Sequence, residues 1–229
     1  IFHLAGDTNM WRKNNARQYE VNVTATQNLV DVALAKEVSR FIHTSSISAF
    51  GFHPDIINES TQSTAMTSGV NYLQTKWLGE QIVKKAVEND GLKAVILNPC
   101  AIIGPHDKHN WSQLFTLVKY NRLPGVPGGE GSYCHVREVA KAHIAAVSKG
   151  KVGENYILAG VDHRFLEVVN KIADKVQRPH YRSTMPSWLL KFVGQVSYWW
   201  SCIVNREPDM TPEKAKMVTE RVVATSNKA

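Results

Sequence analysis

The 229-residue sequence is poor in cysteine, and the spacing of its cysteines does not pair them. Only Cys100, Cys134 and Cys202 occur, far apart and without a C-x-x-C pair. An odd number of widely separated cysteines argues against a disulfide framework and against a zinc knuckle. It favours a reducing compartment, so we expect a cytoplasmic protein.

Long runs of charge and of apolar residues are also absent. The sequence has 27 Lys and Arg against 20 Asp and Glu, a formal net charge of +7, but no basic run exceeds two residues. Charge scattered in this way favours solubility, and we expect no nucleic-acid partner. With 43% apolar and 21% charged residues, the composition is that of a globular protein and excludes a disordered or fibrous one.

The nine histidines form no recognisable metal site. His106 and His109 flank Asp107, but no third ligand follows at a helical or hairpin spacing, and no HExxH motif occurs. We therefore expect no bound metal.

Short apolar segments alternate with longer segments of helical period. The pattern predicts strands over 1–5, 40–44 and 92–97, and helices over about 14–36 and 70–89. Such alternation is typical of β-α units that feed a parallel sheet. The sequence therefore predicts an α/β fold with a doubly wound parallel sheet.

The second half of the chain is less regular. Its predicted elements are a loop over 123–131, a helix over 136–148, a strand over 155–158 and a helix over 163–176. Segment 187–204 repeats apolar residues at steps of three and four, which predicts an amphipathic helix. It is interrupted by Lys191 and Gln195 and is too short to span a bilayer, which takes about 20 mostly apolar residues. Packing on its own domain is the simplest interpretation, but Trp199 and Trp200 leave open a peripheral membrane contact or a homodimer.

Tyr72 and Lys76 lie one turn apart on the second predicted helix, so their side chains share one face. A nearby ammonium favours the phenolate and lowers a tyrosine pKa by roughly 1 to 3 units. General acid-base catalysis near neutral pH then becomes feasible. The spacing alone also arises by chance, and an ordinary helical tyrosine is the alternative.

Thr44, Ser45 and Ser46 strengthen this interpretation, because they stand at the carboxyl end of a predicted strand. Open α/β sheets bind ligands outside the carboxyl ends of their strands. A hydroxyl there can hold a carbonyl or carbinol oxygen while Tyr72 exchanges its proton.

Six motifs, in order, resemble the extended short-chain dehydrogenase/reductase superfamily, which includes the NAD-dependent epimerase/dehydratase family. They lie at 2–6, 22–29, 44–46, 72–76, 98–105 and 133–143. Within the superfamily the sequence looks most like dihydroflavonol-4-reductase-like and 3β-hydroxysteroid dehydrogenase-like reductases. The resemblance implies a Rossmann-type fold and NADP or NAD as cofactor.

The resemblance also implies roles for individual residues. Ser46 would orient the reacting oxygen, Tyr72 would exchange the proton, and Lys76 would lower the pKa of Tyr72 and bind the nicotinamide ribose. Asn22 would lie near the cofactor and the proton relay, although a plain polar helix residue is the alternative. The residues expected at the cofactor are Ala5, Gly6, Thr44, Ser45, Tyr72, Lys76, Asn98 and Pro99.

One departure from the family is that no Gly-rich phosphate-binding turn precedes His3. We therefore expect an N-terminally truncated fragment with little activity of its own. Residues 1–105 and 132–160 are expected to form the rest of the dinucleotide-binding domain, and 106–131 and 161–229 a mostly helical substrate-binding lobe. The choice between NAD and NADP stays open, because the residue that reads the ribose 2′ position would precede this sequence.

The leading hypothesis is an NAD(P)H-dependent oxidoreductase. It would transfer a hydride between nicotinamide and a small-molecule carbonyl or secondary alcohol through Ser46, Tyr72 and Lys76. One alternative is a nucleotide-sugar epimerase or dehydratase that keeps NAD bound. The other is a non-catalytic scaffold or membrane-surface binding protein. The Trp-rich segment 187–204 favours an apolar or aromatic substrate over a nucleotide sugar.

Overall fold

The computed structural model describes residues 1–108 and 110–229, so His109 and the metal ligation considered for it lie outside the described residues. Four parallel strands form the main sheet in the order β1-β2-β3-β6. They span Phe2–His3, Phe41–Thr44, Ala94–Pro99 and Asn155–Leu158. The four predicted strands are confirmed, the first of them shorter than expected.

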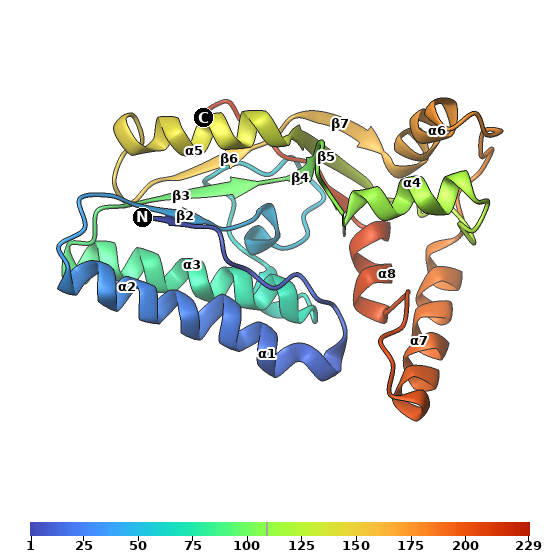
Figure 1. Ribbon diagram of the computed structural model, residues 1–229, viewed down its shortest axis with the longest axis horizontal. Coiled ribbons are helices and arrows are strands. Elements are labelled where there is room, and N and C mark those ends of the chain that lie inside the picture. Colours follow the sequence, from blue (N-terminus) through green and yellow to red (C-terminus); the bar gives the residue numbers. More distant parts are fainter. Residues whose placement is uncertain (109) are drawn as a thin grey trace.

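Helices cover both faces of this sheet (Figure 1). Helices α2 (Ala25–Ala35) and α3 (Asn71–Asp90) lie on one face and α5 (Val136–Ser148) on the other. Phe41 and Ile96 pack with α2 and α3, whereas Ile42 and Val95 pack with α5. Because successive strand residues point to opposite faces, a sheet buried on both sides needs such continuous apolar strands. The predicted doubly wound, Rossmann-type fold is confirmed.

The first predicted helix is one segment of changing pitch. It begins with the 3₁₀ turn η1 (Arg12–Asn14) and continues through α1 (Asn15–Tyr19), the π-type η2 (Glu20–Thr24) and α2. Thr26 Oγ1 of α2 donates a hydrogen bond to the backbone oxygen of Asn22 in the π turn at 2.9 Å. Local pitch changes of this kind often lie at functional sites. The extent of the helix is confirmed, and its π turn was not predicted.

Helix α3 approaches η2 closely because residue 79 is glycine. A Cβ on Gly79 would lie 2.5 Å from Asn22 O, a distance that side-chain carbons essentially never show. The helix ends at Gly91, whose φ of 74° is the left-handed conformation that favours glycine. This helix carries Tyr72 and Lys76, so the contact with η2 fixes where both residues lie.

A second sheet adjoins the carboxyl ends of β1–β3. It has the order β4-β5-β7, with β8 also paired to β5. Its strands are Ala101–Ile103, Glu130–His135, Val161–Arg164 and Arg221–Val222. Two predictions are corrected here. The loop over 123–131 ends where Glu130 begins β5, and the helix predicted from 163 begins at Phe165. In both cases the pairing of β5 with β7 draws the residues into a strand.

Helices gather beyond the second sheet. They are α4 (Trp111–Lys119), α6 (Phe165–Lys175), α7 (Ser187–Val204) and α8 (Pro212–Thr219). Helices α7 and α8 stand side by side at the end of the molecule away from the carboxyl terminus (Figure 1). The 3₁₀ turns η3 (Ile47–Phe50) and η4 (Ala65–Thr67) connect β2 to α3. Helices α4 and α8 were not predicted, and the proposed division into two domains stays a prediction. Within 1–108 and 110–229, no helix is long and apolar enough to cross a membrane.

Candidate active site

The carboxyl ends of β1, β2 and β3 open into a cleft of about 470 Å³. Gly6, Ser45, Ser46 and Pro99 line one wall from the strand ends. Helix α3 adds Tyr72 and Lys76, and the opposite wall is Ile102, Trp111, Tyr133, Phe165, Met217 and Val222. The cleft therefore lies where open α/β sheets bind their ligands.

Ser46 and Tyr72 meet in this cleft. Both side chains line it, with the Ser46 hydroxyl close enough to influence the pKa of the Tyr72 phenol. The backbone amide of Ser48 donates to Ser46 Oγ at 3.1 Å, which holds the hydroxyl at the beginning of η3. The structure thus brings together the two residues that the sequence proposed as partners around one reacting oxygen.

The pKa of Tyr72 is raised, mainly because burial disfavours the phenolate, and the nearby Ser46 hydroxyl opposes this only in part. The spacing to Lys76 predicted a lowered pKa for Tyr72. This prediction is wrong for the chain without a ligand, because the effect of burial on the phenol is larger than any opposing effect. The phenol is protonated at neutral pH, which is the form that can donate a proton.

Lys76 is buried, and its amine donates to Thr44 O at 2.9 Å. Burial lowers its pKa to about 8, and the charge of Glu80 opposes that shift. A Cβ on Gly6 would lie 3.9 Å from Lys76 Nζ, so the amine faces the backbone just after β1. The bond to Thr44 uses one of three ammonium donors. The ammonium of Lys76 could donate to the hydroxyls of a nucleotide ribose, and glycine at position 6 leaves room for that ribose in the cleft.

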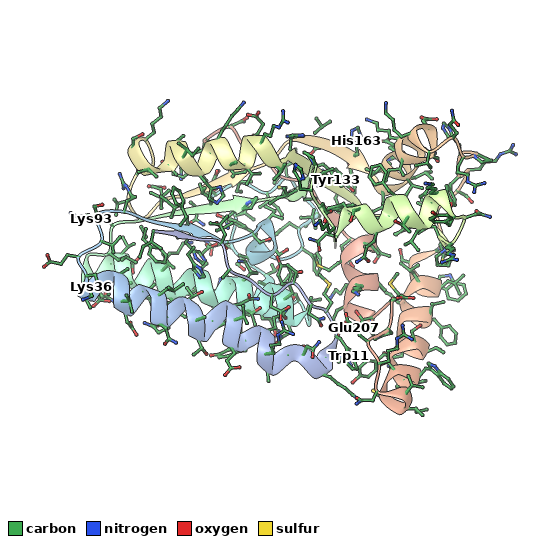
Figure 2. All side chains as sticks on the ribbon, in the orientation of Figure 1. Trp11, Lys36, Lys93, Tyr133, His163 and Glu207 are labelled. Carbon is green, nitrogen blue, oxygen red and sulfur yellow. The ribbon has the colours of Figure 1, made fainter. Side chains whose placement is uncertain are left out.

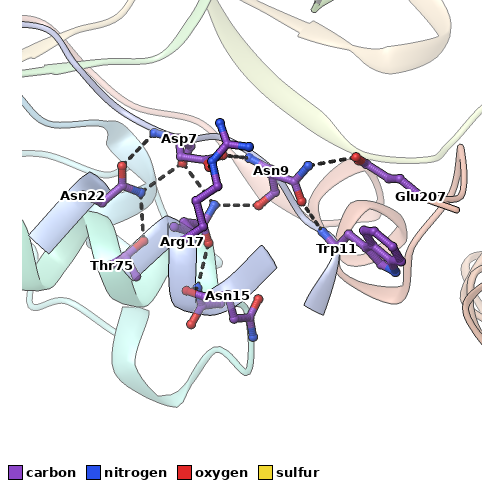
Figure 3. Close-up of polar contacts among 10 residues, drawn as sticks. Asp7, Asn9, Trp11, Asn15, Arg17, Asn22, Thr75 and Glu207 are labelled. Carbon is purple, nitrogen blue, oxygen red and sulfur yellow. Dashed lines mark hydrogen bonds and ion pairs between the residues drawn. The ribbon is translucent and has the colours of Figure 1, made fainter. Parts of the chain in front are cut away.

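Asn22 fixes the loop after β1 (Figure 3). Its Oδ1 accepts from the Asp7 amide at 2.8 Å, and its Nδ2 donates to Asp7 O and to Thr75 Oγ1, each at 3.0 Å. Asp7 follows Gly6 in the chain, and Thr75 precedes Lys76 on α3. Asn22 therefore holds the backbone at Gly6 against the part of α3 that carries Lys76. Its predicted place in a proton relay stays a prediction.

The same loop continues as a ladder of side chain-to-backbone bonds (Figure 3). The Asn9 amide donates to Asp7 Oδ1, and the Trp11 amide donates to Asn9 Oδ1, each at 2.8 Å. Asn9 Nδ2 then donates to Glu207 Oε2 at 3.0 Å. Figure 2 shows Trp11 and Glu207 close together, where the first segment of the chain meets the region of α7 and α8.

The carboxylate of Glu80, which was not predicted from the sequence, is buried behind the cleft. Glu80 Oε2 accepts from Ser45 Oγ at 2.7 Å and from Asn98 Nδ2 at 2.8 Å. Its Oε1 accepts from Asn155 at 2.8 Å and pairs with Lys84 at 2.9 Å. The network ties β2, β3 and β6 to α3. The sequence does contain a sign of Glu80, because residues 72, 76 and 80 are spaced by four and therefore share one face of the helix.

Three other residues predicted at the cofactor have different surroundings. Asn98 is fully buried behind the cleft, where it donates to Ser46 O at 3.1 Å. Thr44 lines the cleft, but its hydroxyl is bonded to His143 Nε2 at 2.7 Å. Ala5 is exposed and stands outside the described residues that line the cleft.

The chain is similar to known proteins along its whole length. Residues 1–159 match the model of the NAD dependent epimerase/dehydratase family. A Synechocystis sp. protein named as a dihydroflavonol 4-reductase is 27% identical over the whole chain. Sterol demethylase protein B of Methylococcus capsulatus is 27% identical over 85% of the chain. A 3beta-hydroxysteroid-dehydrogenase/decarboxylase (isoform 2) of Arabidopsis thaliana is 24% identical over the whole chain.

The chain spans 69%, 60% and 44% of the length of these three relatives. Among solved structures, that of gox2253 matches the whole chain and 70% of its own, with 27% identity and a TM-score of 0.82. A UDP-glucuronic acid 4-epimerase from Bacillus cereus, solved with UDP-glucuronic acid and NAD, matches 99% of the chain and 66% of its own. Its identity is 16% and its TM-score 0.75, a likeness of fold.

Proposed function

The chain belongs to the NAD dependent epimerase/dehydratase family, and we propose that its cleft is the active site of an NAD(P)-dependent oxidoreductase. The predicted family and fold class are confirmed, and the predicted cofactor, NADP or NAD, is confirmed at the level of the family. The observation that carries the proposal is the meeting of Ser46, Tyr72 and Lys76 in one cleft at the strand ends.

In the proposed reaction a carbonyl is reduced to a secondary alcohol, or the alcohol is oxidised. A bound nicotinamide would supply the hydride to the carbonyl carbon, or accept it in the reverse direction. Ser46 Oγ holds the carbonyl oxygen, and Tyr72 gives its phenolic proton to that oxygen as negative charge develops there. The raised pKa of Tyr72 supports the reduction, because the proton is present at neutral pH.

Lys76 and the strand ends would hold the nucleotide. The Lys76 ammonium, oriented by Thr44 O, would donate to ribose hydroxyls and stabilise the Tyr72 phenolate in the oxidation. Gly6, Thr44, Ser45 and Pro99 would contribute their backbone atoms and the shape of the cleft wall. Asn22 and Asn98 would act as positioning residues, through Asp7 and Ser46.

The cleft favours a neutral, largely apolar substrate. Its wall opposite the strand ends is mainly aromatic and aliphatic, with the Trp111 and Tyr133 rings edge to face at 5.2 Å. Among the described residues that line it, Lys76 is the one cation, and Glu130 and Glu220 are the anions. A nucleotide sugar brings a diphosphate, which proteins usually bind with several cationic donors. An epimerase or dehydratase is therefore the less supported alternative.

A non-catalytic scaffold is less supported still, because Ser46, Tyr72 and Lys76 all line the same cleft. We propose a small-molecule carbonyl or alcohol as the partner of the cleft. For the compartment we propose the cytoplasm, on the three unpaired thiols.

Replacing Tyr72 by Phe tests the proposal. We expect turnover of NADPH with apolar ketones, in the longest form of the protein that contains this chain, to fall by about 10² to 10⁴. The affinity for NADPH should stay nearly unchanged, since the phenol ring remains.

Tyr120→Phe, which alters an exposed tyrosine outside the cleft, is the matched control and should keep wild-type turnover. Equal turnover in Tyr72→Phe and Tyr120→Phe would remove Tyr72 from the mechanism. Co-purified NAD⁺ with no net turnover of NADPH would favour the epimerase alternative.

A further inference from the structure

Helix α7 packs on the protein with one side only. Leu190, Gly194 and Ser201 form its buried side. A Cβ on Gly194 would lie 3.0 Å from Thr211 O, so α7 lies almost in backbone contact with the beginning of α8. The predicted packing of this helix on its own domain is therefore correct for one side.

The other side of α7 is apolar and exposed. Trp188 is 70% exposed, Trp199 61% and Ile203 77%. We call this side the α7 face, and its residues are Trp188, Phe192, Val196, Trp199, Trp200 and Ile203. Apart from the adjacent Trp199 and Trp200, they recur at steps of three and four, opposite the buried side. A contiguous exposed patch of this kind marks a contact surface, because solvated faces of surface helices are normally polar.

The charges in and beside α7 are basic along the chain, and among the described residues Lys191 is the one of them that pairs with an acid, Glu220 at the end of α8, at 3.7 Å. Residues 178–206 contain four Lys or Arg and no Asp or Glu. Arg178 and Arg182 precede the helix, Lys191 lies within it and Arg206 follows it, all exposed. Glu207, the next acid along the sequence, accepts a hydrogen bond from Asn9 and pairs with Lys214 at 3.6 Å. The surface is therefore complementary to a negatively charged partner, and a second copy of the chain would bring like charges together.

We propose that the α7 face docks on an anionic lipid bilayer and lies in the plane of its interface. A helix with an apolar aromatic side and basic neighbours binds in this way, about 5–10 Å into the boundary between headgroups and acyl chains. Tryptophan is enriched at that depth, where its ring is apolar and its indole N–H meets polar groups.

Docking through α7 would bring the cleft close to the lipid. Helix α8 lies against α7 and lines the cleft with Met217 and Val218. On the other side, Trp11 Nε1 donates to Ser201 Oγ of α7 at 3.2 Å and links α7 to the loop after β1. If the proposed function is correct, an apolar substrate dissolved in the bilayer would have a short path to Tyr72. The docking itself does not depend on that function.

Vesicle flotation of the full chain tests the docking. We expect the chain to float with vesicles of phosphatidylcholine mixed with phosphatidylserine, to bind pure phosphatidylcholine less, and to bind less at high salt. Phe192→Ser with Trp199→Ser should weaken binding about tenfold or more, since each removes apolar area from the interface. Arg182→Gln with Arg206→Gln should weaken binding to anionic vesicles only.

Ile144→Ser is the matched control, because Ile144 is 70% exposed on α5, away from the α7 face. All altered side chains are exposed, and circular dichroism would verify that each variant keeps the fold. No binding to anionic vesicles would overturn the proposal, as would equal losses in the Ile144 and α7 variants. A lipid-free dimer that Phe192→Ser with Trp199→Ser dissociates would assign the α7 face to a second copy instead.

Discussion

Lys76 carries its charge where burial disfavours it. Its pKa falls to about 8 from an ordinary 10.5. The pKa values of His3 and His43 are lowered as well, first by burial and then by the charge of Lys76. The spacing between Tyr72 and Lys76 was readable from the sequence. The directions of their pKa shifts were not, because they depend on how deeply α3 is packed under the sheet.

The variant Lys76→Met distinguishes the effect of this charge on stability from its effect on turnover. Methionine keeps the length of the side chain without the ammonium, so we expect the free energy of unfolding at pH 7 to rise by on the order of 2 kcal/mol. Turnover should be lost in the same variant. Urea unfolding and NADPH consumption measure the two effects.

The pH dependence of that stability difference has a definite sign. Between pH 8 and 10.5 the native chain has released the Lys76 proton while the unfolded chain still holds it, so wild-type stability rises with pH across this window. The advantage of Lys76→Met should therefore shrink toward about pH 10. A difference that stays constant with pH would contradict the assigned cause of the shift.

Among the elements, long helices with local signals were predicted best. The ranges 136–148 and 187–204 agree with α5 and α7, because apolar periodicity and local stop signals define them. Strands β4, β5, β7 and β8 were missed, since each is stabilised by pairing in a sheet with segments up to about ninety residues away. The π turn of η2 was missed for a similar reason, because it depends on contact with α3.

Gly79→Ala tests the contact between η2 and α3. In an isolated helix alanine is better than glycine by about 1 kcal/mol. Here the new Cβ would meet Asn22 O at 2.5 Å, so the helices must separate. We expect a net loss of about 2 kcal/mol of stability and weaker NADPH binding, because Asn22 would no longer hold Asp7. Thermal unfolding measures the first effect and fluorescence titration the second.

Glu88→Ala, at an exposed position of the same helix, should leave both quantities nearly unchanged. A more stable Gly79→Ala variant with unaltered NADPH affinity would show that the two helices do not constrain the cleft.

In the whole molecule the cleft has two walls of different origin. The wall with Ser46, Tyr72 and Lys76 comes from motifs that are local in the sequence, and it could be predicted. The apolar wall joins Trp111, Phe165 and other residues from helices and strands far apart in the chain, so only the fold reveals it. The same holds for the α7 face, whose exposure depends on which side of α7 meets α8.

The most direct test of the active-site assignment is a crystal structure with NADPH bound, determined on the longest form of the protein that contains this chain. We predict that Lys76 Nζ contacts a hydroxyl of the nicotinamide ribose. The nicotinamide ring should lie beside Ser46 and Tyr72, with its ribose against the Gly6 backbone. A nucleotide bound outside the cleft, or bound inside it with Lys76 and Tyr72 turned away, would contradict the account.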